Sequence, residues 1–291
     1  MIPAQFDYVR PAAMHEALQI LVDREGDAKI LAGGYSLLPL LKLRLASPAL
    51  LVDIRDIDGL DEIVETTDGL RIGSRSTHRS ILENPVVVAG YPLLSDAAGG
   101  IGDPQVRNWG TIGGSCAHAD PSSDWPAVLI ATSASIVLRS TAGERTVPAR
   151  SFFVDTFQTA IEPTELLTEV IIPRAPRPSG AAYAKLERRA GDFSTVGVAA
   201  QLSLGADGRI AAAGIGLTAV AEAPFAATAA EASLIGSEPN EAAFQAAGIA
   251  AAAESRPGSD SHGPAEYKRA MVKEMVVRAL RSAAGRAQAQ R

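Results

Sequence analysis

The chain has 291 residues, of which 47% are hydrophobic, 5% aromatic and 21% charged, with a net charge of −6. This composition excludes a disordered chain. The acidic balance argues against nucleic acid or an anionic membrane as partner, since both require a basic face. No uncharged apolar stretch approaches the ~20 residues of a membrane helix, and the first residues lack the pattern of a secretory signal, so we expect a cytoplasmic protein. The length favours two or three subdomains over one core.

The N-terminal part predicts a small α/β unit. Apolar residues recur at helical spacing over 11–26, and residues 28–32 and 50–54 have the pattern of short buried strands. A second apolar segment, 37–45, follows the Gly33-Gly34 pair and is predicted to be helical. We therefore assign residues 1–57 to a first subdomain.

The middle part predicts strands at 63–66 and 70–74, joined by a tight turn at Asp68-Gly69. Residues 92–124 are rich in glycine and lack clear periodicity, which predicts an irregular segment. A helix at 124–132, a hairpin formed by 136–138 and 144–147, and a strand at 166–172 follow. The proline-rich stretch 173–180 is the best linker, so we assign 58–176 to a second subdomain.

The C-terminal part changes in character. Strands are predicted at 183–187, 195–204 and 210–217, the last two paired across Asp207-Gly208. Alanine-rich helices are predicted at 225–235, 240–254 and 265–284. Residues 177–291 are therefore expected to form an antiparallel sheet with a helical layer, and the whole chain an α+β fold.

The single cysteine, Cys116, cannot form an internal disulfide and cannot by itself hold an iron–sulfur cluster, which normally takes four thiolates. No two of the four histidines have the spacing of a metal pair on one helix face. His118 and Asp120 come closest to a ligand pair, but a polar loop or the edge of a cofactor site is the favoured interpretation. We expect no metal site, so any redox chemistry would depend on an organic cofactor bound non-covalently.

Two glycine pairs are candidates for binding phosphate. Gly33-Gly34 follows a predicted strand and precedes Ser36, while Gly113-Gly114 lies between Thr111 and Ser115. Glycines let the backbone adopt positive φ and expose consecutive N–H groups, and we expect Gly33 and Gly114 to reject a side chain for this reason. Each pair could also be an ordinary turn. Two such segments suit a dinucleotide, although neither fits the G-x-G-x-x-G or Gly-Lys-Ser/Thr patterns.

The segments KILAGGYSLLP (29–39), PQVRNWGTIGGS (104–115) and AHADP (117–121) carry a specific resemblance. They resemble the FAD-binding subunit of molybdenum hydroxylases, in particular the medium subunit of aerobic carbon monoxide dehydrogenase. The resemblance extends from Phe6 to Arg269, nearly the whole chain. It implies a two-subdomain FAD-binding fold of the vanillyl-alcohol-oxidase/PCMH-like type, followed by a C-terminal domain.

The resemblance also implies that FAD lies between the first two subdomains, with both glycine segments around its pyrophosphate. The positions carried over as cofactor-binding are Lys29, Ala32, Gly33, Gly34, Tyr35, Ser36, Ile101, Thr111, Gly113, Gly114, Ser115, Asp124, Leu167 and Lys185. Lys29 or Lys185 would offset the phosphate charge. Tyr35 often corresponds to His or Gln in relatives and Ser115 to Asp or Asn, so a contact made there by a longer side chain would be lost or water-mediated. Phe193 is either an aromatic stacked near the flavin or a core residue.

The implied function is electron transfer, with no substrate-hydroxylating residue in this chain. A molybdenum-cofactor large subunit would oxidise the substrate, and an iron–sulfur small subunit would relay the electrons, in a dimer of heterotrimers. The flavin subunit would pass them to a quinone or another acceptor. Two alternatives stay open: the flavin subunit of a hydroxylase acting on an aldehyde, purine or N-heterocycle, or a non-catalytic dinucleotide-binding assembly module.

Overall fold

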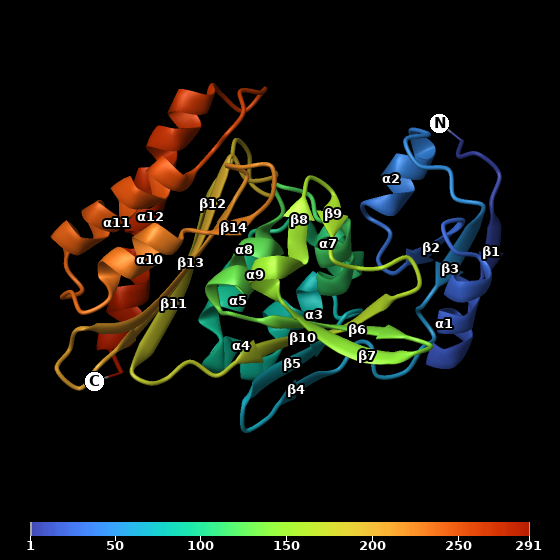
Figure 1. Ribbon diagram of the computed structural model, residues 1–291, viewed down its shortest axis with the longest axis horizontal. Helices are drawn as coiled ribbons and strands as arrows, with labels where there is room; N and C mark the ends of the chain where they lie inside the picture. Colours follow the sequence, from blue (N-terminus) through green and yellow to red (C-terminus); the bar gives the residue numbers. More distant parts are fainter. Residues whose placement is uncertain (1, 291) are drawn as a thin grey trace.

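The computed structural model describes residues 2–290. The chain forms three units in a row, each built on its own sheet, with the N-terminal unit at one end and the C-terminal unit at the other (Figure 1). The sheets have three, five and four strands, and a two-stranded ribbon accompanies the middle unit. The predicted α+β class, with a C-terminal antiparallel sheet and helices, is confirmed.

The first unit has a parallel sheet in which β3 lies between β1 and β2. Its elements are β1 (Asp7–Val9), α1 (Met14–Asp23), β2 (Ala28–Leu31), α2 (Leu37–Lys42) and β3 (Leu50–Asp53). Helix α1 packs on the sheet through Ala17, Leu18 and Leu21, whose spacing places them on one helix face. The strand β1 was not predicted, because three residues are too few to show an alternating pattern.

The middle unit has an antiparallel sheet of order β4-β5-β10-β6-β7. Its strands are β4 (Ile63–Glu65), β5 (Gly69–Gly73), β6 (Ser135–Ser140), β7 (Gly143–Pro148) and β10 (Leu166–Pro173), and the ribbon is β8 (Phe153–Asp155) with β9 (Gln158–Thr159). The predicted hairpins β4–β5 and β6–β7 are confirmed. The main core packs the sheet against helices, with Trp125 fully buried at its centre.

The prediction of an irregular segment over 92–124 is wrong, because this part of the chain forms short helices. The helices of the middle unit are α3 (His78–Glu83), α4 (Pro85–Gly90), α5 (Pro92–Gly99), α6 (Pro104–Trp109), α7 (Ile112–His118), α8 (Asp124–Ala131) and α9 (Ala149–Phe152). Asp103 and Thr111 cap the N-termini of α6 and α7 through their side chains. Helices of six to eight residues have only about two turns, so hydrophobic periodicity does not reveal them.

The C-terminal unit has a sheet of order β11-β12-β13-β14, covered on its outer side by helices (Figure 1). Its elements are β11 (Ser179–Leu186), β12 (Val196–Leu204), β13 (Ile210–Thr218), β14 (Phe225–Ala226), α10 (Thr228–Leu234), α11 (Glu241–Glu254) and α12 (Ala265–Gln288). The predicted β12–β13 hairpin is confirmed. The helix predicted from 225 begins at Thr228 instead, since Phe225 and Ala226 pair with β13.

Two glycines of β13 bring the C-terminal sheet close to α8 of the middle unit. A Cβ on Gly214 or Gly216 would lie 2.0 Å from the carbonyl oxygen of Ala131 or Ala127, respectively. Only glycine permits this backbone approach. The middle and C-terminal units are therefore packed directly on each other. No helix within residues 2–290 combines the length and apolarity needed to cross a membrane.

Candidate functional site

The first glycine segment, Ala32–Ser36, connects β2 to α2 and presents a row of unpaired backbone amides. Among the described residues, none of the N–H groups from Gly33 to Leu37 donates a hydrogen bond. Gly34 has φ +79°, which favours glycine, and the segment is half-buried to exposed. Consecutive N–H groups that the protein leaves unpaired are donors suited to an anion.

The second glycine segment differs from its prediction as a loop. Gly113 and Gly114 lie in the first turn of α7, and neither they nor Gly33 has positive φ, so the expected reason for glycine at these positions is wrong. The Gly113 amide donates to the Ser74 carbonyl at 2.8 Å, and the Gly114 amide donates to Thr111 Oγ1 at 3.1 Å. These amides are already paired within the protein. A Cβ on Gly113 would lie 2.5 Å from Ser74 Cβ, so this glycine is required for packing.

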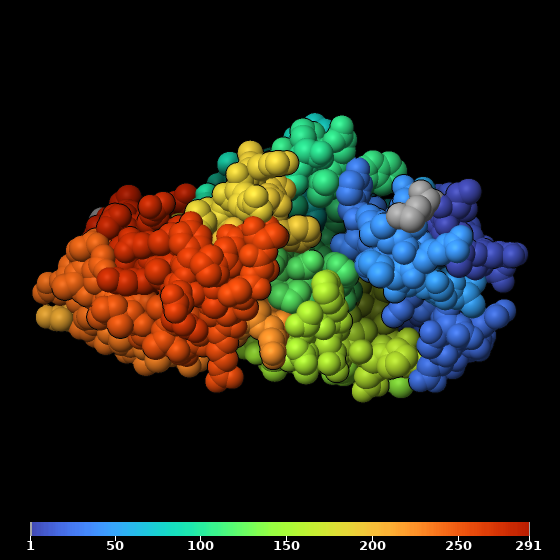
Figure 2. Space-filling model, turned by 90° about the horizontal axis from the view of Figure 1, so that it is seen from above, coloured from blue at the N-terminus to red at the C-terminus, as the bar shows by residue number. Residues whose placement is uncertain are grey.

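The structure brings the two glycine segments together although they are far apart in sequence. A Cβ on Gly33 would lie 2.0 Å from the carbonyl oxygen of Trp109, just before Gly110 and the N-cap Thr111. From above, Figure 2 shows a recess between the blue N-terminal unit and the yellow segment near residue 190, with green residues of the middle unit below. The Gly33 contact places the row of free amides beside the start of α7.

A buried histidine packs against the start of the second glycine segment. The Nδ1 of His78 accepts a hydrogen bond from Trp125 Nε1 at 3.0 Å, and a Cβ on Gly110 would lie 2.7 Å from His78 Nε2. Burial lowers the pKa of His78 to about 4, with the charge of Arg107 acting in the same direction. The ring is therefore neutral near pH 7 and acts as a packing and hydrogen-bonding element. No sequence motif pointed to this role.

Asp124 and Lys185 are brought together in a buried ion pair, 3.0 Å from Oδ2 to Nζ. Asp124 Oδ1 also accepts hydrogen bonds from Tyr183 Oη at 2.5 Å and Ser194 Oγ at 2.8 Å. Burial raises the pKa of Asp124 above its ordinary value, although all three partners oppose this. Burial, with the Asp124 charge, also raises the pKa of Tyr183. No sequence motif pointed to Tyr183 or Ser194, which lie 59 and 70 residues from Asp124.

This pairing changes what Lys185 can contribute. Its Nζ donates to the Gly100 carbonyl at 2.9 Å and to Asp124, and Glu187 lies 3.5 Å away. The Lys185 charge is therefore already balanced inside the protein. Lys29 is different, because it is exposed on β2 shortly before the free amides and has no ion-pair partner among the described residues. Of the two lysines, Lys29 is the one available to an anion.

The remaining predicted positions occupy different surroundings. Ser115 Oγ lies 2.6 Å from Ser123 Oγ, next to Asp124, and half-buried Ile101 follows Gly100, which Lys185 contacts. Leu167 is 5% exposed and belongs to the middle core, away from the open surface. Phe193 is 53% exposed, so the alternative of a core aromatic is wrong.

The arrangement fits a phosphate-bearing cofactor. The Gly33 position cannot hold a side chain, and the adjoining amides are accessible and unpaired, as a diphosphate requires. Within residues 2–290 no group of three His, Cys, Asp or Glu side chains could hold a metal ion. Fold and site together define an α+β protein with a surface suited to an anionic organic cofactor beside the junction of two units.

Comparison with known families specifies this class. Residues 4–175 match the family described as "FAD binding domain in molybdopterin dehydrogenase", and residues 181–283 match "CO dehydrogenase flavoprotein C-terminal domain". The carbon monoxide dehydrogenase medium chain of Hydrogenophaga pseudoflava is 42% identical over 97% of this chain and 98% of its own length. The nicotine 6-hydroxylase medium subunit of Paenarthrobacter nicotinovorans is 37% identical over 96% and 97%, respectively.

Solved structures agree with these matches. A chain of reconstituted CO dehydrogenase from Oligotropha carboxidovorans superposes with a TM-score of 0.95 at 40% identity, covering 98% of this chain and all 100% of that one. A chain of quinoline 2-oxidoreductase from Pseudomonas putida 86 gives 0.92 at 35% identity, covering 98% and 99%. The chain belongs to the CO dehydrogenase medium-chain family, the FAD-binding flavoprotein subunits of molybdenum hydroxylases.

Proposed function

We propose that this subunit works in a carbon monoxide dehydrogenase complex, where it receives electrons from iron–sulfur clusters and passes them to a quinone or another acceptor. The observation that carries the proposal is the row of unpaired amides from Gly33 to Leu37 beside Trp109 and α7, in a chain 42% identical to a carbon monoxide dehydrogenase medium chain. The partners would be an iron–sulfur small subunit and a molybdenum-cofactor large subunit, in a dimer of heterotrimers. A cytoplasmic location is part of the proposal and agrees with one buried, unpaired cysteine.

In this proposal the amides of the Ala32–Ser36 segment hold the FAD diphosphate, and Lys29 balances part of its charge. The other predicted positions form the remaining walls of the site: Ile101, Thr111, Gly113, Gly114, Ser115, Asp124, Leu167 and Lys185. The division into 1–57, 58–176 and 177–291 belongs to the same proposal and is supported by one main sheet in each segment.

Bound FAD supplies a redox centre that exchanges electrons singly or in pairs, which suits a link between one-electron clusters and a two-electron acceptor. The chain's own residues bind and orient this centre. Asp124, which is held by three partners, and His78, which is buried and neutral, are not placed for acid–base chemistry on a substrate. Burial also raises the pKa of Cys116, which keeps its thiol protonated and unreactive.

The test compares the FAD-loaded subunit alone with the complex reconstituted from all three subunits, each mixed anaerobically with carbon monoxide. We expect the flavin absorbance at about 450 nm to decrease only in the complex. Dithionite, which reduces flavin chemically, is the positive control for the isolated subunit. Bleaching of the isolated subunit by carbon monoxide would refute the electron-relay role. An intact complex that ignores carbon monoxide but responds to an N-heterocycle would refute the assignment of substrate.

The second candidate function, a flavin subunit for another substrate, is favoured by the nicotine 6-hydroxylase medium subunit, whose 37% identity is close to the 42% above. The two candidates share the same FAD-binding and electron-transfer role in this chain. They differ in the large subunit, where the substrate would bind. Identification of the chain that co-purifies with this subunit separates them.

A further inference from the structure

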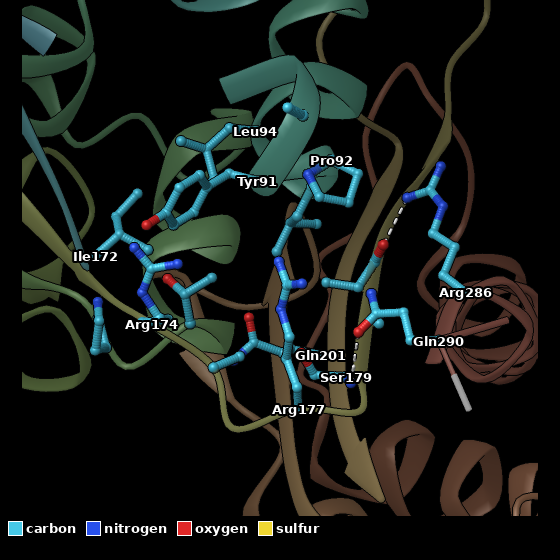
Figure 3. Close-up of a pocket in the computed structure, with 18 of the residues that line it drawn as sticks. Tyr91, Pro92, Leu94, Ile172, Arg174, Arg177, Ser179, Gln201, Arg286 and Gln290 are labelled. Carbon is cyan, nitrogen blue, oxygen red and sulfur yellow. Dashed lines mark hydrogen bonds between the residues drawn. The ribbon is translucent and has the colours of Figure 1, made fainter. Parts of the chain in front are cut away.

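A second cavity lies away from the glycine segments, at the seam between the middle and C-terminal units (Figure 3). Its volume is about 330 Å³. The α4–α5 segment, the end of β10, the connection to β11 and the end of α12 form its walls. None of the predicted cofactor-binding positions lines it. The volume lies at the lower end of the range for small-molecule sites, which suits a ligand much smaller than a dinucleotide.

The charge of this cavity is unusual for an acidic protein. Arg174, Arg177 and Arg286 line it, and no Asp or Glu does, although the chain carries a net charge of −6. Two of the arginines form ion pairs with carboxylates that do not line the cavity. Arg174 pairs with Glu65 at 2.8 Å, and Arg286 pairs with Asp96 at 2.6 Å.

Arg177 is the arginine without a counter-charge. It makes no hydrogen bond or ion pair with any residue of the described range 2–290. Figure 3 shows its side chain extending toward Pro92, between Arg174 on one side and Arg286 on the other. Within residues 2–290, the three arginines and their two carboxylate partners leave one positive charge without a counter-charge at the cavity. The Arg177 side chain is exposed to solvent, and a cleft lined by charges of one sign attracts counter-ions more strongly than an open surface does.

Neutral polar and apolar groups also line the cavity. The Gln201 side-chain amide lines the cavity and has no hydrogen-bond partner among the described residues. The Tyr91 hydroxyl lies 3.4 Å from Glu65, and burial raises its pKa, so it stays protonated. Pro92 and Ile172 supply apolar surface. The cavity thus combines an unpaired guanidinium and an unpaired amide, both hydrogen-bond donors, with an apolar wall. These groups suit a small molecule or ion that carries an oxyanion.

We propose that this cavity binds a small oxyanion, a phosphate or a carboxylate, through the guanidinium of Arg177 and the amide of Gln201. The guanidinium can donate two parallel N–H bonds to two oxygens of one anion, a geometry that lysine cannot reproduce. Binding would neutralise the one uncompensated charge at the seam. The proposal does not depend on electron transfer or on the identity of the hydroxylase substrate.

The test uses FAD-loaded protein, so that the amides of the Ala32–Ser36 segment do not compete for the probe. Inorganic phosphate and benzoate are titrated separately by isothermal calorimetry at low ionic strength in a zwitterionic buffer. We expect saturable binding of at least one probe. The stronger probe identifies the ligand as phosphate or as a carboxylate with an apolar body.

Two matched variants locate the binding. R177Q removes the charge but keeps a polar, shorter side chain, and it should weaken binding of the probe at least tenfold. R24Q is the control, since Arg24 is exposed at the end of α1 and has no side-chain partner among the described residues, and its binding should match wild type. Circular dichroism and FAD content verify that both variants are folded. Absence of saturable heat with both probes, or equal binding by folded R177Q and wild type, would overturn the proposal.

Discussion

Replacement of Gly33 by alanine should weaken FAD binding strongly while the protein stays folded. A Cβ at this position would lie 2.0 Å from the Trp109 carbonyl oxygen and 3.0 Å from Gly110 Cα. Carbon–oxygen contacts of this kind normally begin at about 3.3 Å. The two segments would therefore have to separate by roughly 1 Å, and the amides following Gly33 would move with their loop.

The size of the effect follows from the amides. A hydrogen bond from an N–H to a charged acceptor contributes about 1.5–3 kcal/mol. If the shift removes two such bonds to the diphosphate, FAD binding loses about 3–6 kcal/mol, which is a factor of roughly 10²–10⁴ in Kd. Because the segment lies on the surface, the change costs far less in global stability than a core substitution would.

The assay measures the quenching of FAD fluorescence as apoprotein is added, for wild type, Gly33→Ala and a control. Gly285→Ala is the matched control, since no atom lies within 4 Å of a Cβ there and the residue is exposed in the last turn of α12. The control should bind FAD normally and lose no stability. If folded Gly33→Ala binds FAD within about threefold of wild type, the contact with Trp109 does not position the cofactor site.

Three further outcomes are expected. Lys185→Met should lower the free energy of unfolding, measured in urea, by about 3–5 kcal/mol, because Asp124 is left as an unpaired buried charge. Adding Asp124→Asn should restore most of this loss. The control Arg139→Met, which breaks an exposed ion pair, should cost less than about 1 kcal/mol. The pKa of His78 is about 4 in the folded protein against 6.5 in the unfolded chain, so its contribution to the free energy of unfolding should be fully present above pH 6.5. This contribution should fall by up to about 3 kcal/mol on acidification to pH 4. The same dependence of stability on pH in His78→Asn would contradict this. Acid precipitation should release all the flavin as FAD, and colour retained in the pellet would refute non-covalent binding.

The features that sequence predicted well are those with a local physical cause. The turns at Asp68-Gly69 and Asp207-Gly208 follow from glycine's tolerance of positive φ, and Gly69 and Gly208 have φ of +151° and +85°. The helix α1 and the strand β3 follow from periodicity and continuous burial. The free amides of the Ala32–Ser36 segment agree with the prediction of a strand, a glycine turn and a helix.

The features that sequence missed depend on packing between distant residues. The helical state of Gly113 and Gly114 is set by the Thr111 cap and by Ser74, which lies 39 residues before Gly113. The contact between Trp109 and Gly33 likewise joins two units that no local pattern relates. Such contacts are determined by how the sheets pack, and a single sequence carries no periodic signal for them.

The distribution of paired and unpaired polar groups explains how an acidic chain can bind a diphosphate. On the opposite wall of the site, the charge of Lys185 is balanced within the protein, because Lys185 is bonded to Asp124 and both are nearly inaccessible. On the N-terminal side, the amides from Gly33 onward are free and accessible, with exposed Lys29 nearby. Backbone dipoles bind an anion without adding net charge, and accessible amides remain hydrated until it arrives, so they avoid the cost of buried unpaired donors. If this loop holds the diphosphate, as we propose, the attraction for the anion is concentrated there, and the Asp124–Lys185 network on the opposite wall is already balanced within the protein.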